Sequence, residues 1–366
     1  MFVWLSTALA GFTPAPDQVL TLPGPQFVEF MAVGDVNGDG YDDVVRDSQW
    51  EPGSPYYLML GSPNGLLPNG ILLPGGGAFL RALDVNGDGY DDVVGTHWGL
   101  RQLFVLHGAA TLPSAPSAII GVDGANTGLP GDFDGDGYDD LPVETWDGVV
   151  SGVEVFFGSP AGLGTSPGFS MHDGVALAGA CDVNGDGYDD LARIYDDRIE
   201  VNAGSALGLD ATTTWTFAWP YRGSHSWLFD RGDIDGDGYE DLLVGGARGG
   251  RGEEFLLLGG PNGFHAAVLL PRLMGAFTRL TVLPDRDGDG DDEVLRGSPD
   301  WGHTYAQDHG RVDLFEGGTG TYAGGYAGTG QDGMGFLVVA GDFDGDGSSD
   351  WLATGRWPEA MVDYGP

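Results

Sequence analysis

Short apolar runs alternate with acidic, glycine-rich turns along the whole chain. One apolar run leads into each acidic turn, as at residues 80–83, and a second follows at once, as at residues 242–244. A third run, as at residues 153–157, ends in a Gly-rich turn, and a weaker fourth run, as at residues 71–73, precedes the next acidic turn. Apolar runs of this length bounded by turn residues predict β-strands, and no window of helical periodicity competes with them.

The acidic turn is a nine-residue motif that occurs seven times. Its sequences are DVNGDGYDD, DFDGDGYDD, DIDGDGYED, DRDGDGDDE and DFDGDGSSD. The copies start at residues 35, 84, 132, 182, 233, 285 and 342, so successive starts lie 49, 48, 50, 51, 52 and 57 residues apart. One such period with four strands is about the size of a propeller blade. We therefore predict an all-β fold, a seven-bladed β-propeller with four antiparallel strands in each blade.

The two ends of the chain indicate how the ring closes. After the seventh motif the chain supplies a third strand at residues 361–364 and then stops, without the end of the turn or a fourth strand. Gly11 and Phe12 resemble the end of that turn, and residues 19–22 resemble a fourth strand. We expect the N-terminal strand to complete the last blade, which removes exposed sheet edges. Residues 11–366 are then one domain, and residues 1–10 resemble the end of a secretory signal, which favours export.

The motif has the composition of a calcium loop. With its residues numbered as positions one to nine, positions one, three, five and nine are always Asp, Asn or Glu, and positions four and six are always Gly. Alternating oxygen side chains converge as the backbone turns, position seven adds its backbone carbonyl, and position nine closes the site. Ca²⁺ takes six to eight oxygen ligands, so we predict up to seven Ca²⁺ sites. The predicted ligands are Asp35, Asn37, Asp39, Tyr41, Asp43, Asp84, Asn86, Asp88, Tyr90, Asp92, Asp132, Asp134, Asp136, Tyr138, Asp140, Asp182, Asn184, Asp186, Tyr188, Asp190, Asp233, Asp235, Asp237, Tyr239, Asp241, Asp285, Asp287, Asp289, Asp291, Glu293, Asp342, Asp344, Asp346, Ser348 and Asp350.

Two other interpretations of the motif do not fit the sequence. An EF-hand needs a Glu at the twelfth position and helices on both sides, and here the twelfth residues are Arg, Gly, Val or Ala between strand signals. A solvated turn does not explain why 32 of the 55 acids lie in the seven motifs. Asp291 and the pair Ser348 and Ser349 depart from the Tyr-Asp pattern, and we expect those two sites still to bind. Calcium affinity should be modest, on the order of 10⁻⁴–10⁻³ M, and its role structural.

The net charge of −40 excludes several classes of partner. Phosphates of nucleic acid and anionic membrane surfaces would be repelled. No apolar run approaches the roughly 18 residues of a membrane span, and we expect a monomer. The single cysteine, Cys181, lies in an apolar run and is expected to be a buried thiol.

The motifs resemble the FG-GAP repeats of integrin α chains and the VCBS-type repeats of bacterial exported proteins. FFGSPAG at residues 156–162 stands in the place of the Phe-Gly…Gly-Ala-Pro signature, and the resemblance covers nearly the whole chain. It implies that the acidic loops lie on the bottom face, between the first and second strands of each blade. It also implies a secreted or cell-surface protein that acts as a binding or adhesion module.

Connections between the second and third strands would then form the top face. Aromatic residues recur there at Trp50, Trp98, Trp146, Tyr195, Trp301 and Trp357. They either pack over their own blades, which we favour, or form stacking platforms for sugars or peptide side chains. The candidate patch for a protein or glycan ligand contains Trp219, Arg222, Trp227, Arg248, Arg251, Trp301 and Tyr305. A polysaccharide lyase and a lectin are the alternatives, and the chain carries no H-E-x-x-H motif.

Overall fold

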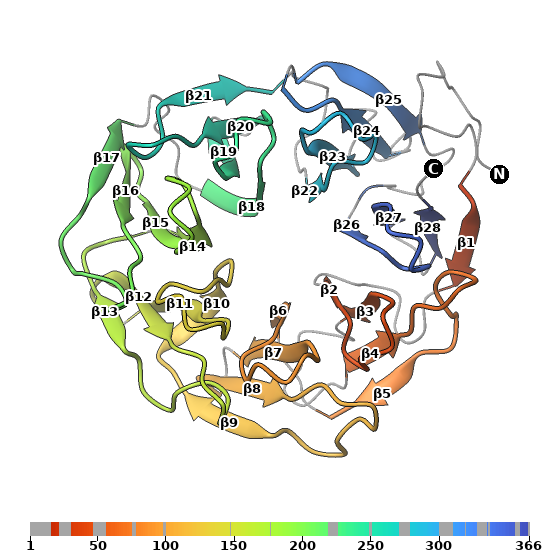
Figure 1. Cartoon of the computed structure of the whole chain (residues 1–366), viewed down its shortest axis with the longest axis horizontal. Helices are drawn as coiled ribbons and strands as arrows, with labels where there is room; N and C mark the ends of the chain where they lie inside the picture. Colours follow the sequence, from red (N-terminus) through yellow and green to blue (C-terminus); the bar gives the residue numbers. More distant parts are fainter. Residues whose placement is uncertain are drawn as a thin grey trace.

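The computed structural model describes residues 16–21, 31–46, 56–74, 78–97, 100–146, 148–175, 177–218, 226–248, 251–270, 279–299, 310–318, 320–327, 335, 337–355 and 359–364. These residues form 28 strands in seven four-stranded antiparallel sheets, with no helix among them. Figure 1 shows the sheets arranged as blades around a ring, each with its first strand innermost. The predicted seven-bladed β-propeller is confirmed.

Blades one to four follow the chain in order. Blade one consists of β2 (Met31–Gly34), β3 (Asp43–Arg46), β4 (Tyr56–Met59) and β5 (Ile71–Leu73). Blade two consists of β6 (Ala78–Leu83), β7 (Asp92–His97), β8 (Gln102–Leu106) and β9 (Ala118–Gly121). Blade three consists of β10 (Gly124–Thr127), β11 (Leu141–Trp146), β12 (Ser151–Phe156) and β13 (Phe169–Met171). Blade four consists of β14 (Leu177–Cys181), β15 (Asp190–Ile194), β16 (Arg198–Asn202) and β17 (Trp215–Ala218).

Blades five to seven complete the ring. Blade five consists of β18 (Ser226–Gly232), β19 (Asp241–Arg248), β20 (Arg251–Leu258) and β21 (Ala266–Leu269). Blade six consists of β22 (Arg279–Leu283), β23 (Glu293–Ser298), β24 (Arg311–Phe315) and β25 (Tyr322–Ala327). Blade seven consists of β26 (Leu337–Gly341), β27 (Asp350–Thr354), β28 (Glu359–Asp363) and β1 (Gln18–Thr21). In every blade the acidic motif joins the first strand to the second, as predicted.

The N-terminal strand closes the last blade. β1 pairs antiparallel with β28, from Gln18 opposite Val362 to Thr21 opposite Glu359, and Figure 1 shows the two side by side. The side chain of Leu20 is only 3% exposed and packs in one cluster with residues of blades one and seven. The strand therefore joins both ends of the chain, while the proposed turn residues Gly11 and Phe12 lie outside the described residues.

The hydrophobic core lies between neighbouring blades. The second strands β3, β15, β23 and β27 are buried along their whole length, because each sheet is covered by a blade on either face. One cluster, for example, combines Ile194 of blade four with Val244 and Phe255 of blade five. Cys181 is a fully buried thiol in the same cluster, as predicted. Each blade thus depends on its neighbours for burial of its apolar side chains.

Adjacent acidic loops also pack directly on one another. The position-seven tyrosine of one blade covers the position-four glycine of the blade before it. A Cβ atom on Gly38 would lie 2.2 Å from the ring of Tyr90, and one on Gly345 would lie 2.5 Å from the ring of Tyr41. The five loops that are covered by such a tyrosine therefore need glycine at position four for two reasons, the left-handed backbone and the neighbouring ring.

Replacing Gly38 with Ala is expected to destabilise the protein by about 3 kcal/mol, because the new methyl group meets Tyr90 and the backbone is left-handed. Gly40 is the matched control, since its φ is +88° and a Cβ atom there would have nothing within 4 Å. Gly40→Ala should cost only about 1–2 kcal/mol, the price of the left-handed backbone. Urea unfolding in chelator measures both values, and equal losses would contradict the packing of Tyr90 on Gly38.

Candidate metal centre

The first aspartate of each motif organises its loop. In blade three, the carboxylate of Asp132 accepts hydrogen bonds from the backbone N–H groups of Gly135, Asp136 and Gly137, at 2.7, 3.1 and 2.8 Å. Asp35, Asp84 and Asp342 accept the same three bonds in their own loops. Gly135 and Gly137 have φ values of +70° and +85°, which allows the tight reversal. The loop therefore holds one carboxylate at its centre through its own backbone.

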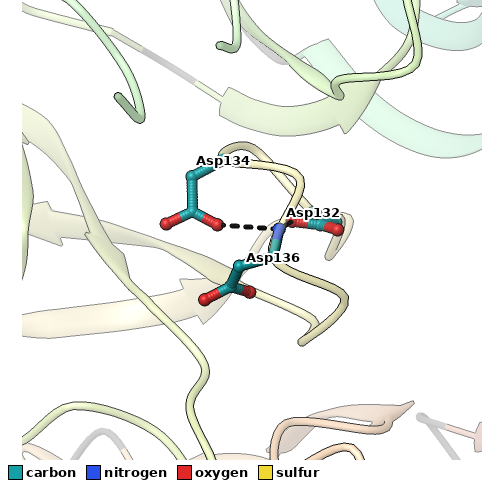
Figure 2. Close-up of side chains that lie close together, drawn as sticks. All are labelled: Asp132, Asp134 and Asp136. Carbon is teal, nitrogen blue, oxygen red and sulfur yellow. Dashed lines mark hydrogen bonds between the residues drawn. The ribbon is translucent and has the colours of Figure 1, made fainter. Parts of the chain in front are cut away.

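The remaining acids of the loop gather around this centre. Carboxylate oxygens of Asp132, Asp134 and Asp136 all lie within 4.8 Å of one another, as do those of Asp233, Asp235 and Asp237 in blade five. Figure 2 shows the blade-three side chains around their turn, with the backbone of Asp136 donating a hydrogen bond to Asp134. Each group has the ligand atoms and spacing that could hold a metal ion.

The ninth residue lies beneath the loop and is buried. Asp43 and Asp92 have no exposed surface, and one oxygen of each accepts the backbone N–H of a turn glycine, Gly61 at 3.0 Å or Gly108 at 2.8 Å. Among the described residues, the other oxygen, Oδ2, has no hydrogen-bond partner in either case. A buried carboxylate oxygen without a donor is unfavourable unless a proton or a cation neutralises it.

The pKa values of the ninth-position acids also indicate that their ionised form is unfavourable without a cation. Burial raises the pKa of Asp43, Asp92 and Asp241 to about 7, and that of Asp140, Asp190 and Glu293 to about 8. Neighbouring acids of the loop raise these pKa values further, and backbone hydrogen bonds partly offset the rise. Without a cation, these acids resist ionisation at neutral pH.

This sets the expected pH dependence of the metal-free protein. The unfolded acids have pKa values near 3.8 for Asp and 4.5 for Glu, so the folded state binds protons more tightly than the unfolded state. Their stabilising effect is full below the unfolded pKa values and is lost as the pH rises through 7 to 8. We expect the chelated protein to melt at a higher temperature near pH 5.5 than near pH 8.5. The dependence should weaken in the double variant Asp43→Asn, Asp92→Asn, and a melting temperature that falls on acidification would contradict it.

The eighth position has a role that the sequence did not reveal. Its side chain accepts the backbone N–H of position one in the preceding blade, while its own N–H donates back to that residue's carbonyl. Asp35 and Asp91 form this reciprocal pair at 2.7 and 3.1 Å, and Asp342 and Asp42 form it across the closure of the ring at 2.9 and 2.9 Å. Six of the seven boundaries carry the carboxylate bond. The only available signal was an acid at position eight in six copies, outside the alternating ligand pattern.

The boundary between blades six and seven uses a different set of contacts. Position eight of copy seven is Ser349, whose hydroxyl donates to the carbonyl of Pro284 at 2.9 Å. Position two of copy six is Arg286, where every other copy has an apolar residue, and its guanidinium donates to the carbonyl of Ser349 at 2.8 Å. Arg286 also forms a buried ion pair with Asp363 of β28. The two sequence departures therefore replace one type of inter-blade contact with another.

Copy six also contains a residue that sequence reasoning missed. Glu316, directly after β24, places a carboxylate oxygen within 4.8 Å of oxygens from Asp287 and Glu293. Oxygens of Asp289, Asp291 and Glu293 form another such group. Burial raises the pKa of Glu316, and repulsion from Asp287 and Asp289 adds to the rise. The Glu lies 23 residues beyond the motif, which is why the repeat pattern did not include it.

Two of the top-face aromatic residues lie in the described part of the chain, and they differ. Tyr195 is buried, with Arg198 stacked 4.0 Å from its ring centroid and its hydroxyl bonded to Asp173 at 2.6 Å. It packs in the cluster between blades three and four, with Arg198 of its own blade over its ring. Trp146, at the end of β11, is 54% exposed and remains available for stacking.

Four of the recurring aromatic positions, Trp50, Trp98, Trp301 and Trp357, lie outside the described residues. So do Trp219, Arg222 and Tyr305 of the candidate ligand patch. Trp227 lies in β18, and Arg248 and Arg251 face each other at the end of the β19–β20 hairpin, as backbone positions.

No family model matches the chain, and solved structures are similar to it only at low sequence identity. A protein from Lactobacillus plantarum is similar with a TM-score of 0.52 and 13% identity, over 84% of this chain and 88% of that one. AofleA from Arthrobotrys oligospora gives a TM-score of 0.49 and 13% identity, over 85% and 89%. The Tc holotoxin pore of Photorhabdus luminescens gives 0.42 and 14%, over 88% of this chain but only 17% of that chain. The likeness to the Lactobacillus plantarum protein concerns the fold alone. Within the described residues, no helix has the length and hydrophobicity needed to cross a membrane.

Proposed function

We propose that the protein is a calcium-binding propeller of the FG-GAP type, in which Ca²⁺ in up to seven acidic loops stabilises the blades. The observation that carries the proposal is the gathering of loop carboxylates, as at Asp132, Asp134 and Asp136, above a buried ninth acid whose pKa is raised by that burial, as for Asp140. The residues fit the ion, because carboxylate, amide and carbonyl oxygens are the ligands that Ca²⁺ takes. In each loop, positions one, three, five and nine would bind through their side chains and position seven through its backbone carbonyl.

The calcium of each loop would act on the joint between two blades. The same loop carries the metal ligands and the position-one backbone groups that bond to the next blade. Neutralising the repelling acids would therefore stabilise the loop and its inter-blade contacts together.

Hydrogen-exchange mass spectrometry with calcium or with chelator tests the proposal loop by loop. Calcium is expected to slow the exchange of the loop amides, such as those of Gly135, Asp136 and Gly137, and magnesium at the same concentration should do so much less. The amides at the centre of buried strands such as β15 serve as the internal control. Identical exchange in the loops with and without calcium would contradict the proposal.

We further propose that the stabilised ring is an exported binding or adhesion module without catalytic activity. Export agrees with sites of modest calcium affinity, which fill outside the cell and not in the cytosol. Half-exposed Trp146 favours a ligand with a flat apolar face, such as a sugar ring or an aromatic peptide side chain. A screen of glycans and surface proteins, with wild type and Trp146→Ala in parallel, tests this assignment. Retention without turnover supports it, and release of product from a polysaccharide would show an enzyme instead.

A further inference from the structure

Blade six differs from every other blade at the end of its third strand. The residue before the glycine of the following turn is Leu60, His107, Phe157, Ala203, Leu258 or Tyr364 in the other blades. In blade six it is Glu316, so only this blade carries a carboxylate at that position. Strand formation does not require a carboxylate at this position, because the other blades form the same strand with aliphatic, aromatic or small residues there.

Glu316 faces the acidic loop of its own blade. One of its carboxylate oxygens lies within 4.8 Å of oxygens from Asp287 and Glu293, positions three and nine of that loop. Glu293 is 1% exposed, and its Oε2 accepts the backbone N–H of Arg286 at 2.7 Å. Its Oε1 has no hydrogen-bond partner among the residues that the structure describes. The group that Glu316 completes thus contains a buried residue, Glu293, that has an unpartnered carboxylate oxygen.

The number of carboxylates separates blade six from the rest of the ring. Its loop supplies Asp285, Asp287, Asp289, Asp291 and Glu293, and Glu316 makes six. The four ligand side chains include three carboxylates in copies one, two and four, and four in copies three, five and seven. Calcium affinity rises with the number of charged oxygen ligands and with the rigidity of the site. The loop that looked least regular in sequence is the one with the most carboxylates.

Building on the proposed calcium function, we propose that blade six holds the tightest cation site of the propeller, with Glu316 as a ligand supplied from outside the loop. At calcium concentrations too low to fill the other loops, this site is filled alone. It lies beside the boundary at which Ser349 replaces the acid of position eight, so the ion strengthens the one described joint without that carboxylate bond.

Calorimetric titration of the full chain with calcium, after removal of bound metal by chelator, tests the inference. The wild type should bind one equivalent with Kd on the order of 10⁻⁶–10⁻⁵ M, before the weaker sites near 10⁻⁴–10⁻³ M. Glu316→Gln, which keeps the shape and removes the charge, should weaken the tight equivalent by about tenfold or more and leave the weaker phase unchanged. Glu154→Gln, on β12 outside every loop and partly buried, is the matched control and should leave both phases unchanged.

Thermal melting of the same variants separates a ligand from a structural side chain. In chelator, Glu316→Gln should melt at the same temperature as wild type or higher, because one repelling carboxylate is gone. With calcium it should melt at a lower temperature. An equal loss in both conditions, or a titration of equivalent sites unchanged by Glu316→Gln, would overturn the inference while calcium binding stands. A protein that binds no calcium at all would overturn the proposed function itself.

Discussion

Removal of calcium is expected to lower the melting temperature of this protein by roughly 10–20 °C. A ligand that binds only the folded state stabilises it by mass action, by about 1.4 kcal/mol for each site at a tenfold excess over Kd. Seven such sites sum to about 10 kcal/mol, comparable with the whole stability of many domains. The physical source is the repulsion among acids such as Asp132, Asp134 and Asp136, which the cation relieves.

The measurement is a thermal melt in excess calcium and in excess chelator, with magnesium in place of calcium as the control. The shift should grow with the logarithm of the free calcium concentration, because binding and folding are linked. A smaller shift is expected for the variant Asp132→Asn, Asp136→Asn, which disables one loop of the seven. A melt that chelator leaves unchanged would contradict a stabilising role for calcium.

Replacing Leu20 with Asp is expected to reduce the stability by about 4–5 kcal/mol, because it places an unpaired charge in the cluster that closes the ring. Leu20 is the buried residue of β1 and packs with Val44 of blade one and Val362 of blade seven. Loss of β1 would also expose the edge of β28, whose backbone groups it satisfies.

Val19 provides the matched control on the same strand. It faces outward and is 51% exposed, so Val19→Asp should change the stability by less than about 0.5 kcal/mol. Denaturant unfolding gives both values, and hydrogen exchange at β28 should increase only in Leu20→Asp. If both variants were equally stable, the closure of the ring by β1 would be contradicted.

The architecture was predictable because each blade repeats one local pattern. Seven motifs about 50 residues apart indicate the number of blades, and the incomplete seventh repeat indicates that residues near Val19 close it. Local chemistry also identified the loops, since the alternation of Asp or Asn with Gly is confined to nine residues. These features depend on neighbours in sequence, which periodicity can detect.

Contacts between blades were not predictable from the same pattern. The carboxylate of Asp91 bonds to the backbone of Asp35, 56 residues away, and the ring of Tyr90 covers Gly38. Within its own loop, Asp91 is only one more acidic residue, and Tyr90 is only a metal ligand through its backbone carbonyl oxygen. Glu316 was missed for a related reason, because strand pairing, and not sequence distance, brings the end of β24 next to the loop that precedes β23.

Arg286 in copy six and Ser349 in copy seven both differ from the repeat pattern, and each is explained only by its contact with the other. Ser349 by itself looks like the loss of an acid, and Arg286 by itself looks like a charge in a core position. In the structure Arg286 reaches the carbonyl of Ser349 and the carboxylate of Asp363, so the boundary keeps its polar contacts. A single sequence shows such a pair as two irregularities, because nothing in it states which blades touch at those residues.

Equilibrium dialysis against saturating calcium, followed by elemental analysis of the metal-to-protein ratio, tests the central claim most directly. The seven acidic loops predict a ratio that approaches seven Ca²⁺ per chain and returns to zero after chelation. If the protein sample contained no more calcium than the dialysis buffer at saturating calcium, the protein would bind none and the central claim would be contradicted.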